Sequence, residues 1–178
     1  LTEQAFFGEI SYQINDSWQV TFGGRSYEYE TEQTTAFDLP LYNTATGVYG
    51  PTGLNPRVKS NSAEDSGSLF KFNTGYDIND DLLVYFTLSE GYRIGGINVI
   101  AECPNPLPDG YQIPCANQDE VLILPDKTFN KEIGMHSSIF DGRFAFNAAI
   151  YDIDWEDVQI AATTKIGALP ITANGGEA

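Results

Sequence analysis

The sequence contains no long hydrophobic run. The longest one extends only from Leu82 to Phe86, even when Tyr85 is counted as apolar, whereas a membrane-spanning helix needs about 20 consecutive apolar residues. This excludes an α-helical membrane protein. A membrane β-barrel stays compatible, because only alternate residues of each strand face lipid and the mean hydropathy of such a chain remains near neutral, here −0.24.

Basic residues are scarce. The chain has 9 Lys and Arg residues against 25 Asp and Glu residues, which gives a formal net charge of −16. This balance argues against nucleic acid or another phosphate-rich surface as a partner. It suits a solvated acidic surface or the binding of cations.

Residues that carry catalytic or metal chemistry are also few. The 178 residues include 1 His and 2 Cys, and no nucleophile motif, phosphate-binding loop, dinucleotide fingerprint or zinc-protease motif occurs. We therefore expect no enzyme activity and no cofactor. The first residues, Leu1 to Glu3, lack the basic start and apolar run of a signal peptide, so we expect a mature chain or a piece of a longer one.

What the sequence has is aromatic residues, at 13%, and 17 glycines, a balance that favours β structure. From Leu82 onward the side chains alternate with a period of two, the pattern of a strand with one apolar and one polar face. The apolar set is Val84, Phe86, Leu88 and Tyr92. The polar set is Tyr85, Thr87, Ser89, Gly91 and Arg93.

The same alternation predicts six strands that form three hairpins. We place the strands at about residues 4–14, 18–30, 67–78, 82–94, 128–139 and 143–157. Short turns join them in pairs at Asn15–Ser17, Asn79–Asp81 and Asp141–Gly142, which have the composition of tight turns.

The connections between the hairpins are long. Residues 31–66 and 95–127 are rich in Thr, Asn, Gly and Pro, and we predict both as surface loops. Short turns at one end and long loops at the other, with strands of about ten alternating residues, are typical of an outer-membrane barrel. The predicted fold class is therefore an all-β, antiparallel up-and-down transmembrane barrel segment. Because closing a barrel takes about eight strands, we expect an internal fragment of a larger barrel.

Several short words of the sequence are similar to the barrel of TonB-dependent outer-membrane receptors. They are F-G-E-I-S-Y at Phe7–Tyr12, G-G-R-S-Y at Gly23–Tyr27, Y-x-x-N-D-x-L from Tyr76, G-Y-R-I-G-G-I-N from Gly91, K-E-I-G-M-H-S-S at Lys131–Ser138 and F-N-A-A-I-Y-D-I-D-W-E-D-V-Q at Phe146–Gln159. Their order and spacing around three matched hairpins carry the resemblance, which covers nearly the whole chain.

The resemblance implies a barrel of about 22 strands with a plugged lumen. It also implies residence in the bacterial outer membrane and import of a scarce nutrient, most often a ferric siderophore, with energy passed on by TonB. The implied partners are the siderophore or a similar nutrient, outer-membrane lipid, a plug domain of the same parent chain, and TonB. The plug domain and the TonB-contacting segment have no counterpart in residues 1–178, so we expect them elsewhere in the parent protein.

Cys103 and Cys115 flank a proline-rich part of the second long segment. Outside the cell such a pair favours a disulfide, worth about 3 kcal/mol in the chain-entropy model. A metal site or free thiols are the alternatives, and a metal site would need further ligands, whereas the only His is His136. The disulfide would present residues such as Tyr111 to a ligand or simply protect the loop.

Five residues are candidates for ligand binding. Tyr42, Tyr49 and Tyr111 lie in the long segments, where tyrosine can stack on or hydrogen-bond to a saccharide or a catecholate. Arg25 and Arg93 lie on the polar face by parity, and this face would line the lumen. There they could receive an anionic siderophore or pair with carboxylates of a plug.

Two further residues share the polar face. Lys71 could act as the two arginines do. His136 is a lone histidine on a wet surface, and we expect it to be a satisfied polar residue rather than a ligand.

Acidic residues crowd the end of the last predicted strand around Trp155. They are Asp152, Asp154, Glu156 and Asp157. Because about ten residues separate them from the last turn, we expect them at or beyond the outer membrane interface as a solvated rim. A calcium site is the alternative, although the spacing matches no EF-hand loop.

Two other functions stay open at this point. A passive porin or adhesion-type outer-membrane barrel would have the same strands without a plug. A soluble β-sandwich binding module would pack Phe70, Phe72, Val84 and Phe86 against a second sheet.

Overall fold

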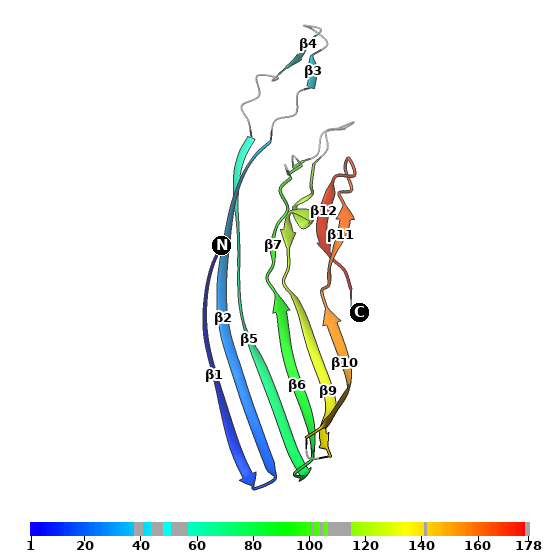
Figure 1. Cartoon of the computed structure of the whole chain (residues 1–178). Coiled ribbons are helices and arrows are strands. Elements are labelled where there is room, and N and C mark those ends of the chain that lie inside the picture. The colour runs from blue at the N-terminus through cyan, green and yellow to red at the C-terminus, as the bar shows by residue number, and fades with distance from the viewer. Residues whose placement is uncertain are drawn as a thin grey trace.

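The computed structural model describes residues 1–37, 41–43, 48–50, 57–100, 102, 103, 105, 106, 115–140 and 142–176. Its main feature is a six-stranded antiparallel sheet in the order β1-β2-β5-β6-β9-β10 (Figure 1). The bounds are Thr2–Asn15 for β1, Trp18–Phe37 for β2, Arg57–Asn79 for β5, Leu82–Arg93 for β6, Asp126–Ile139 for β9 and Phe144–Glu156 for β10. The predicted all-β class, with six strands in three hairpins, is confirmed.

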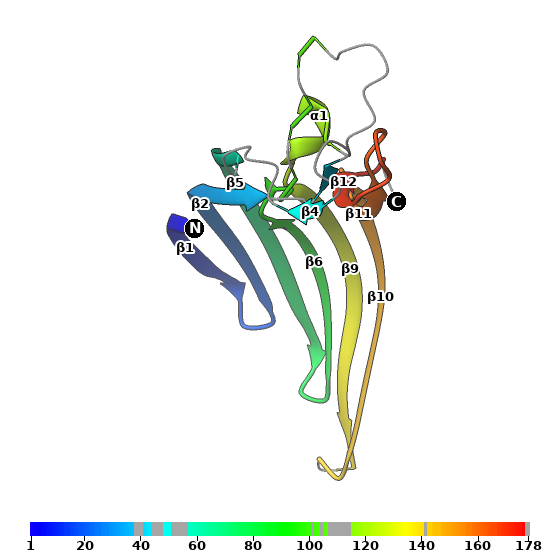
Figure 2. The same cartoon turned by 90° about the horizontal axis from the view of Figure 1, so that it is seen from above.

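Shorter elements lie at one end of this sheet. They are β3 (Leu41–Asn43), β4 (Val48–Gly50), β7 (Gly96–Ile97), α1 (Gln118–Val121), β8 (Leu122–Ile123), β11 (Gln159–Thr163) and β12 (Pro170–Asn174). Figure 1 shows the short turns of the three hairpins together at the opposite end. Seen from above, the sheet is curved and open, with β1 and β10 as its outer strands (Figure 2). Among the described residues no helix is long and apolar enough to cross a membrane.

The first two hairpin turns use the same side-chain device. The Asn15 side-chain oxygen accepts a hydrogen bond from the amide two residues later at 3.0 Å, and Asn79 does the same at 2.9 Å. Asparagine favours such turns because its side chain mimics a backbone carbonyl. In the third turn Asp141 lies outside the described residues, and Gly142 has a φ of 79°, which glycine adopts without strain.

The predicted boundaries of the two long loops need correction. β2 continues to Phe37 and β5 starts at Arg57, so the predicted loop 31–66 is too long at both ends. Thr, Phe and Val in these extensions favour strands, and contacts such as Thr34 Oγ1 to Ser60 Oγ, at 2.9 Å, link the two strands. The second segment, 95–127, contains β7, α1, β8 and the start of β9 rather than loop alone.

One face of the sheet is apolar and bare. It carries exposed side chains of every strand, among them Phe6 at 83% exposure, Phe70 at 65% and Ile150 at 77%. No second layer covers this face in the part of the chain that the structure describes. We call these exposed apolar side chains the apolar belt. Exposing them to water would cost free energy, whereas lipid would solvate them. The soluble sandwich, which needs a second sheet against Phe70 and Phe86, does not fit this arrangement.

Two tyrosines on the other face lie directly over glycines of the neighbouring strand. Tyr85 is paired with Gly134 and Tyr27 with Gly67. A Cβ atom at Gly134 would lie 2.5 Å from the Tyr85 ring, and one at Gly67 would lie 2.6 Å from the Tyr27 hydroxyl. A larger residue at either position would therefore have to displace the tyrosine ring.

The two faces predict opposite responses to a new charge in β6. We expect Phe86→Arg to impair membrane assembly, because arginine on the lipid side costs about 2 to 4 kcal/mol near the midplane. Thr87→Arg, one residue away on the polar face, should be tolerated far better. The measurement is the amount of folded, protease-resistant receptor in the outer-membrane fraction for each variant. Equal losses at the two positions would show that the faces are assigned wrongly.

Candidate ligand-binding face and surface platform

The other side of the sheet is called the polar face. It is formed by the odd-numbered residues of β1, β2, β5, β6 and β10 and by the even-numbered residues of β9. The cross-strand register places these side chains in rows from strand to strand. Hydrogen bonds within the rows join Ser11 to Thr21 (2.8 Å), Asn73 to Thr87 (2.7 Å) and Tyr85 to Glu132 (2.6 Å). Hydroxyl and amide groups thus make an uncharged band across β1, β2, β5 and β6, and this band ends at the Glu132 carboxylate of β9.

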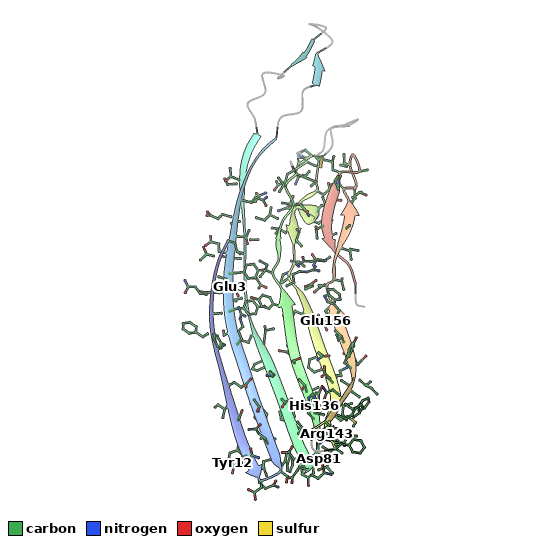
Figure 3. All side chains as sticks on the ribbon, viewed as in Figure 1. Glu3, Tyr12, Asp81, His136, Arg143 and Glu156 are labelled. Carbon is green, nitrogen blue, oxygen red and sulfur yellow. A yellow bond between two sulfur atoms is a disulfide. The ribbon has the colours of Figure 1, made fainter. Side chains whose placement is uncertain are left out.

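Toward the turns the polar face is hollowed. A depression of about 400 Å³ is lined by side chains such as Asp77, Tyr85 and His136, and Figure 3 labels His136 near this end. The His136 Nδ1 atom is 2.9 Å from Asn147 Oδ1, and its ring stacks on Tyr85 at 5.1 Å. His136 is thus an engaged polar residue of the wall.

Ion pairs occupy the polar face farther from the turns. The Arg25 guanidinium lies 2.5 Å from a carboxylate oxygen of Glu3, and Lys71 Nζ lies 3.1 Å from Glu9. Glu3, labelled in Figure 3, also accepts a hydrogen bond from the Tyr92 hydroxyl at 2.7 Å. Arg25 and Lys71, the cations expected to meet a ligand or a plug, are therefore both engaged by carboxylates of β1.

Tyr92 does not lie on the apolar face as its parity predicts. Its ring stacks on Tyr27 with centroids 3.9 Å apart, and Tyr27 belongs to the polar face. The reason is that β5 and β6 separate beyond the pair Lys71–Ser89, the last in their register. The Tyr92 side chain lies in the resulting opening between the two strands. The face on which it lies is therefore set by the end of strand pairing and not by the residues around it in the sequence.

Other contacts also bridge this opening. The Phe70 amide donates to the Glu90 carboxylate at 2.9 Å, so a side chain satisfies a strand amide that has lost its β6 partner. Tyr29, only 4% exposed, accepts a hydrogen bond from the Gly95 amide at 2.9 Å. A Cβ atom at Gly95 would collide with the backbone carbonyl of Ile123, so the close approach requires glycine.

A buried carboxylate holds the upper ends of three strands together. Asp126, at the start of β9 and 1% exposed, pairs with Arg93 at the end of β6. It also accepts a hydrogen bond from the Gln159 amide of β11 at 3.2 Å. The Gln159 side chain in turn donates to the carbonyls of Ile94 and Leu124, both at 3.0 Å. We call this group the Asp126 clamp.

The protonation of Asp126 reflects these partners. Burial alone would raise the pKa of its carboxyl, but the hydrogen bonds from Arg93 and from the Gln159 amide, with the charge of Arg93, bring the pKa below its ordinary value of 3.8. Asp126 is thus held as the carboxylate that the clamp requires.

Beyond the clamp the chain folds into a surface platform made of β7, α1, β8, β11 and β12. Its centre is Asn98, which is 8% exposed. The Asn98 amide donates to the carbonyls of Glu120 and Thr172 at 2.8 and 2.7 Å, and its oxygen accepts from the Thr172 amide at 2.9 Å. One side chain therefore joins the second long segment to the β11–β12 hairpin.

An apolar cluster and a disulfide complete the platform. Ile97, Ala116 and Val121 are buried together. Cys103 and Cys115 are bonded to each other across 12 residues, which confirms the predicted disulfide. The Cys115 amide donates to the Ile166 carbonyl at 3.2 Å, so the disulfide is attached to the β11–β12 hairpin as well.

The candidate ligand-binding residues are spread over the structure. Tyr42 and Tyr49 are paired in the small β3–β4 hairpin, which lies beyond the ends of β2 and β5 (Figure 1). Tyr111 lies outside the described residues. Arg25 and Arg93 lie on the polar face in the ion pairs given above. The structure does not bring the described tyrosines and arginines into one site.

Sequence patterns missed Asp126, Gln159 and Asn98. Asp126 and Arg93 are 33 residues apart, and Asn98 and Thr172 are 74 apart, so no local spacing links them. The local indications are the G-G-I-N word that contains Asn98 and the word at Phe146–Gln159 that ends with Gln159.

The acidic group at the end of β10 is partly neutralised. Lys131 Nζ lies 3.2 Å from Asp152 and 2.7 Å from Asp154 on the apolar side of the sheet, just beyond the exposed belt. Glu156 is labelled farther along the strand in Figure 3. No cluster of three or more His, Cys, Asp or Glu side chains suited to a metal ion occurs among the described residues.

Together, the apolar belt, the polar face and the separation of short turns from long segments define a segment of a membrane β-barrel. The chain belongs to the family of TonB-dependent receptor-like β-barrels, whose family model matches residues 1–178. Receptors of this family are outer-membrane transporters of Gram-negative bacteria and not enzymes, which agrees with the expectation from the sequence.

Two solved structures share the fold. The ferric yersiniabactin uptake receptor FyuA from Yersinia pestis superposes with a TM-score of 0.65 at 18% identity over 98% of this chain and 22% of that receptor. The ferric-catecholate import receptor Fiu from Escherichia coli K12 gives 0.60 at 18% identity, over 96% of this chain and 23% of that receptor. The chain thus spans less than a quarter of the length of either receptor.

The Asp126 clamp predicts a local loss of protection in Asp126→Asn. We expect a cost of about 1 to 3 kcal/mol and faster hydrogen exchange in β11, whose Gln159 amide bonds the carboxylate. Because the folded pKa lies below 3.8, the contribution is complete above that pH and is lost as the pH falls through the folded value. The matched control is Asp152→Asn, whose side chain is 72% exposed and should change little. Unchanged exchange in β11 of Asp126→Asn would contradict the clamp.

The disulfide predicts that replacing both cysteines weakens the platform. Removing the link between Cys103 and Cys115 should cost up to about 3 kcal/mol by the chain-entropy model. Thermal unfolding of the receptor with Cys103→Ser and Cys115→Ser, compared with the unsubstituted receptor before and after reduction, measures the loss. Reduction should lower the unfolding temperature of the unsubstituted receptor and leave the double variant unchanged. If reduction lowered the unfolding temperature of both proteins, the stabilisation would not come from the bond between Cys103 and Cys115.

Proposed function

We propose that this chain is part of an outer-membrane receptor that takes up a ferric siderophore with energy supplied through TonB. The observation that carries the proposal is membership of the TonB-dependent receptor-like barrel family over the whole chain. The similarity of the fold to two receptors for ferric complexes supports the choice of nutrient.

The proposal assigns a task to each face. The apolar belt contacts outer-membrane lipid, and the polar face lines the lumen and meets a plug domain supplied by the same parent protein. Tyr42, Tyr49 and Tyr111, in the long segments that leave the sheet opposite the short turns, contact the arriving ligand. Arg25 and Arg93 stabilise the wall of the barrel through their ion pairs with Glu3 and Asp126. Of the two roles expected for these arginines, this is pairing with carboxylates rather than direct ligand binding.

The test is iron uptake in the producing bacterium. We expect a strain that lacks the gene to lose growth on iron-depleted medium supplemented with one ferric siderophore from a set of hydroxamates, catecholates and mixed-ligand complexes. Loss of TonB should abolish growth on the same complex, and a plasmid copy of the gene should restore the gene-deletion strain. Equal uptake of radioactive iron by parent and deletion strains from every complex would refute the proposal.

A further inference from the structure

The charges of the polar face are unevenly distributed. Among the side chains that the structure describes, its Lys and Arg residues are Arg25, Lys71 and Arg93. Its carboxylates are Glu3, Glu9, Asp65, Asp77, Asp126 and Glu132. Among the described side chains, acidic ones are therefore twice as many as basic ones; the side chains of Arg57 and Lys59, which parity assigns to the same face, lie outside them.

Every one of these cations is already engaged. Arg25 pairs with Glu3, Lys71 with Glu9 and Arg93 with Asp126. His136 shares a hydrogen bond with Asn147. An anion that approached the described wall would find each positive charge with a carboxylate beside it.

Two carboxylates of the face have no cationic partner in the described part of the chain. They are Asp65, near the long-segment end, and Asp77, near the turns. Glu132 accepts a hydrogen bond only from the neutral Tyr85 hydroxyl, at 2.6 Å. The excess negative charge is therefore distributed along the length of the wall.

Between these charges the wall offers neutral hydrogen-bonding groups. Ser11 with Thr21 and Asn73 with Thr87 form the uncharged band, and Ser89 and Asn130 are paired in the row above it. Such groups can hydrogen-bond an uncharged, oxygen-rich ligand. A polyanion in a confined lumen would instead experience the field of the carboxylates, which a narrow passage concentrates.

We propose that the ligand carried past this wall is uncharged or cationic, so that a polyanionic ferric complex is selected against. The inference rests on the proposed uptake function and specifies its substrate class. The formal net charge of −16 for the whole chain acts in the same direction during the approach of a ligand.

The first experiment measures the charge preference without any knowledge of the ligand. The full-length receptor carries Ser89→Cys, which puts a thiol on the polar face opposite Lys71, while Cys103 and Cys115 are joined to each other. Its modification is timed with a trimethylammonium and a sulfonate methanethiosulfonate reagent, each normalised to its rate with a small thiol in solution. We expect the cationic reagent to react about five-fold faster or more. An equal or faster reaction with the anionic reagent overturns the inference.

Two matched variants test whether the named charges cause the preference. In the Ser89→Cys background, Glu9→Gln leaves Lys71 without its carboxylate and should lower the cation-to-anion rate ratio by about two-fold to three-fold. Lys71→Gln leaves Glu9 without its cation and should raise the ratio. Opposite shifts support the inference, and the same shift in both variants contradicts it.

The second experiment uses two ferric complexes as probes of full-length receptor. Quenching of intrinsic fluorescence is titrated with an uncharged ferric trihydroxamate and with a polyanionic ferric tris-catecholate. Tighter binding of the uncharged complex, by about ten-fold or more, supports the inference, whereas equal or tighter binding of the polyanion overturns it and leaves the uptake function intact. If neither complex binds, the siderophore assignment loses support, and the thiol rates alone decide the charge preference.

Discussion

The structure depends on one constraint, which is that a chain facing lipid has no water to hydrogen-bond its backbone. Each amide and carbonyl must then be paired within the protein, and antiparallel strands with a continuous register satisfy this need. The register between the six long strands is continuous except for bulges beside the first two turns, and between β5 and β6 it ends at Lys71–Ser89. Because pairing uses only backbone atoms, the side chains remain free to make one face for lipid and the other for water.

Where the strand pairing ends, side chains form the hydrogen bonds to the backbone groups that have lost a strand partner. β5 and β6 part beyond Lys71 and Ser89, and there the Glu90 carboxylate accepts the free amide of Phe70. Farther from the turns the Asp126 clamp and Asn98 bond backbone groups of the irregular segments. This change of mechanism begins at the level of Phe70, an exposed residue of the apolar face, and continues toward the long segments. Among the described residues, the irregular segments therefore lie at this end of the sheet.

The sequence predicts well what depends on near neighbours and poorly what depends on distant ones. The period of two predicted the strands and, for residues such as Phe86 and Thr87, their faces. The asparagines of the first two turns marked the hairpins because each bonds an amide two residues later. Tyr92 was assigned to the wrong face because its position follows from the separation of two strands, and Asp126 was missed because its partners are far along the chain. The pattern predicts loop for the extensions of β2 and β5 because these extensions are mainly polar on both faces, so alternation gives no contrast.

The weak sequence identity with receptors of the same fold follows from the same constraint. At 18% identity the fold still superposes with a TM-score of 0.65, because lipid requires only that outward side chains be apolar and that the backbone be paired. Few positions demand one residue type. Gly95 against Ile123 is one of them, since any side chain would meet a backbone carbonyl. The polar face is under no such demand from the membrane, so its charges can change without loss of the barrel. The ion pairs and carboxylates of that face are therefore free to differ among receptors of this fold.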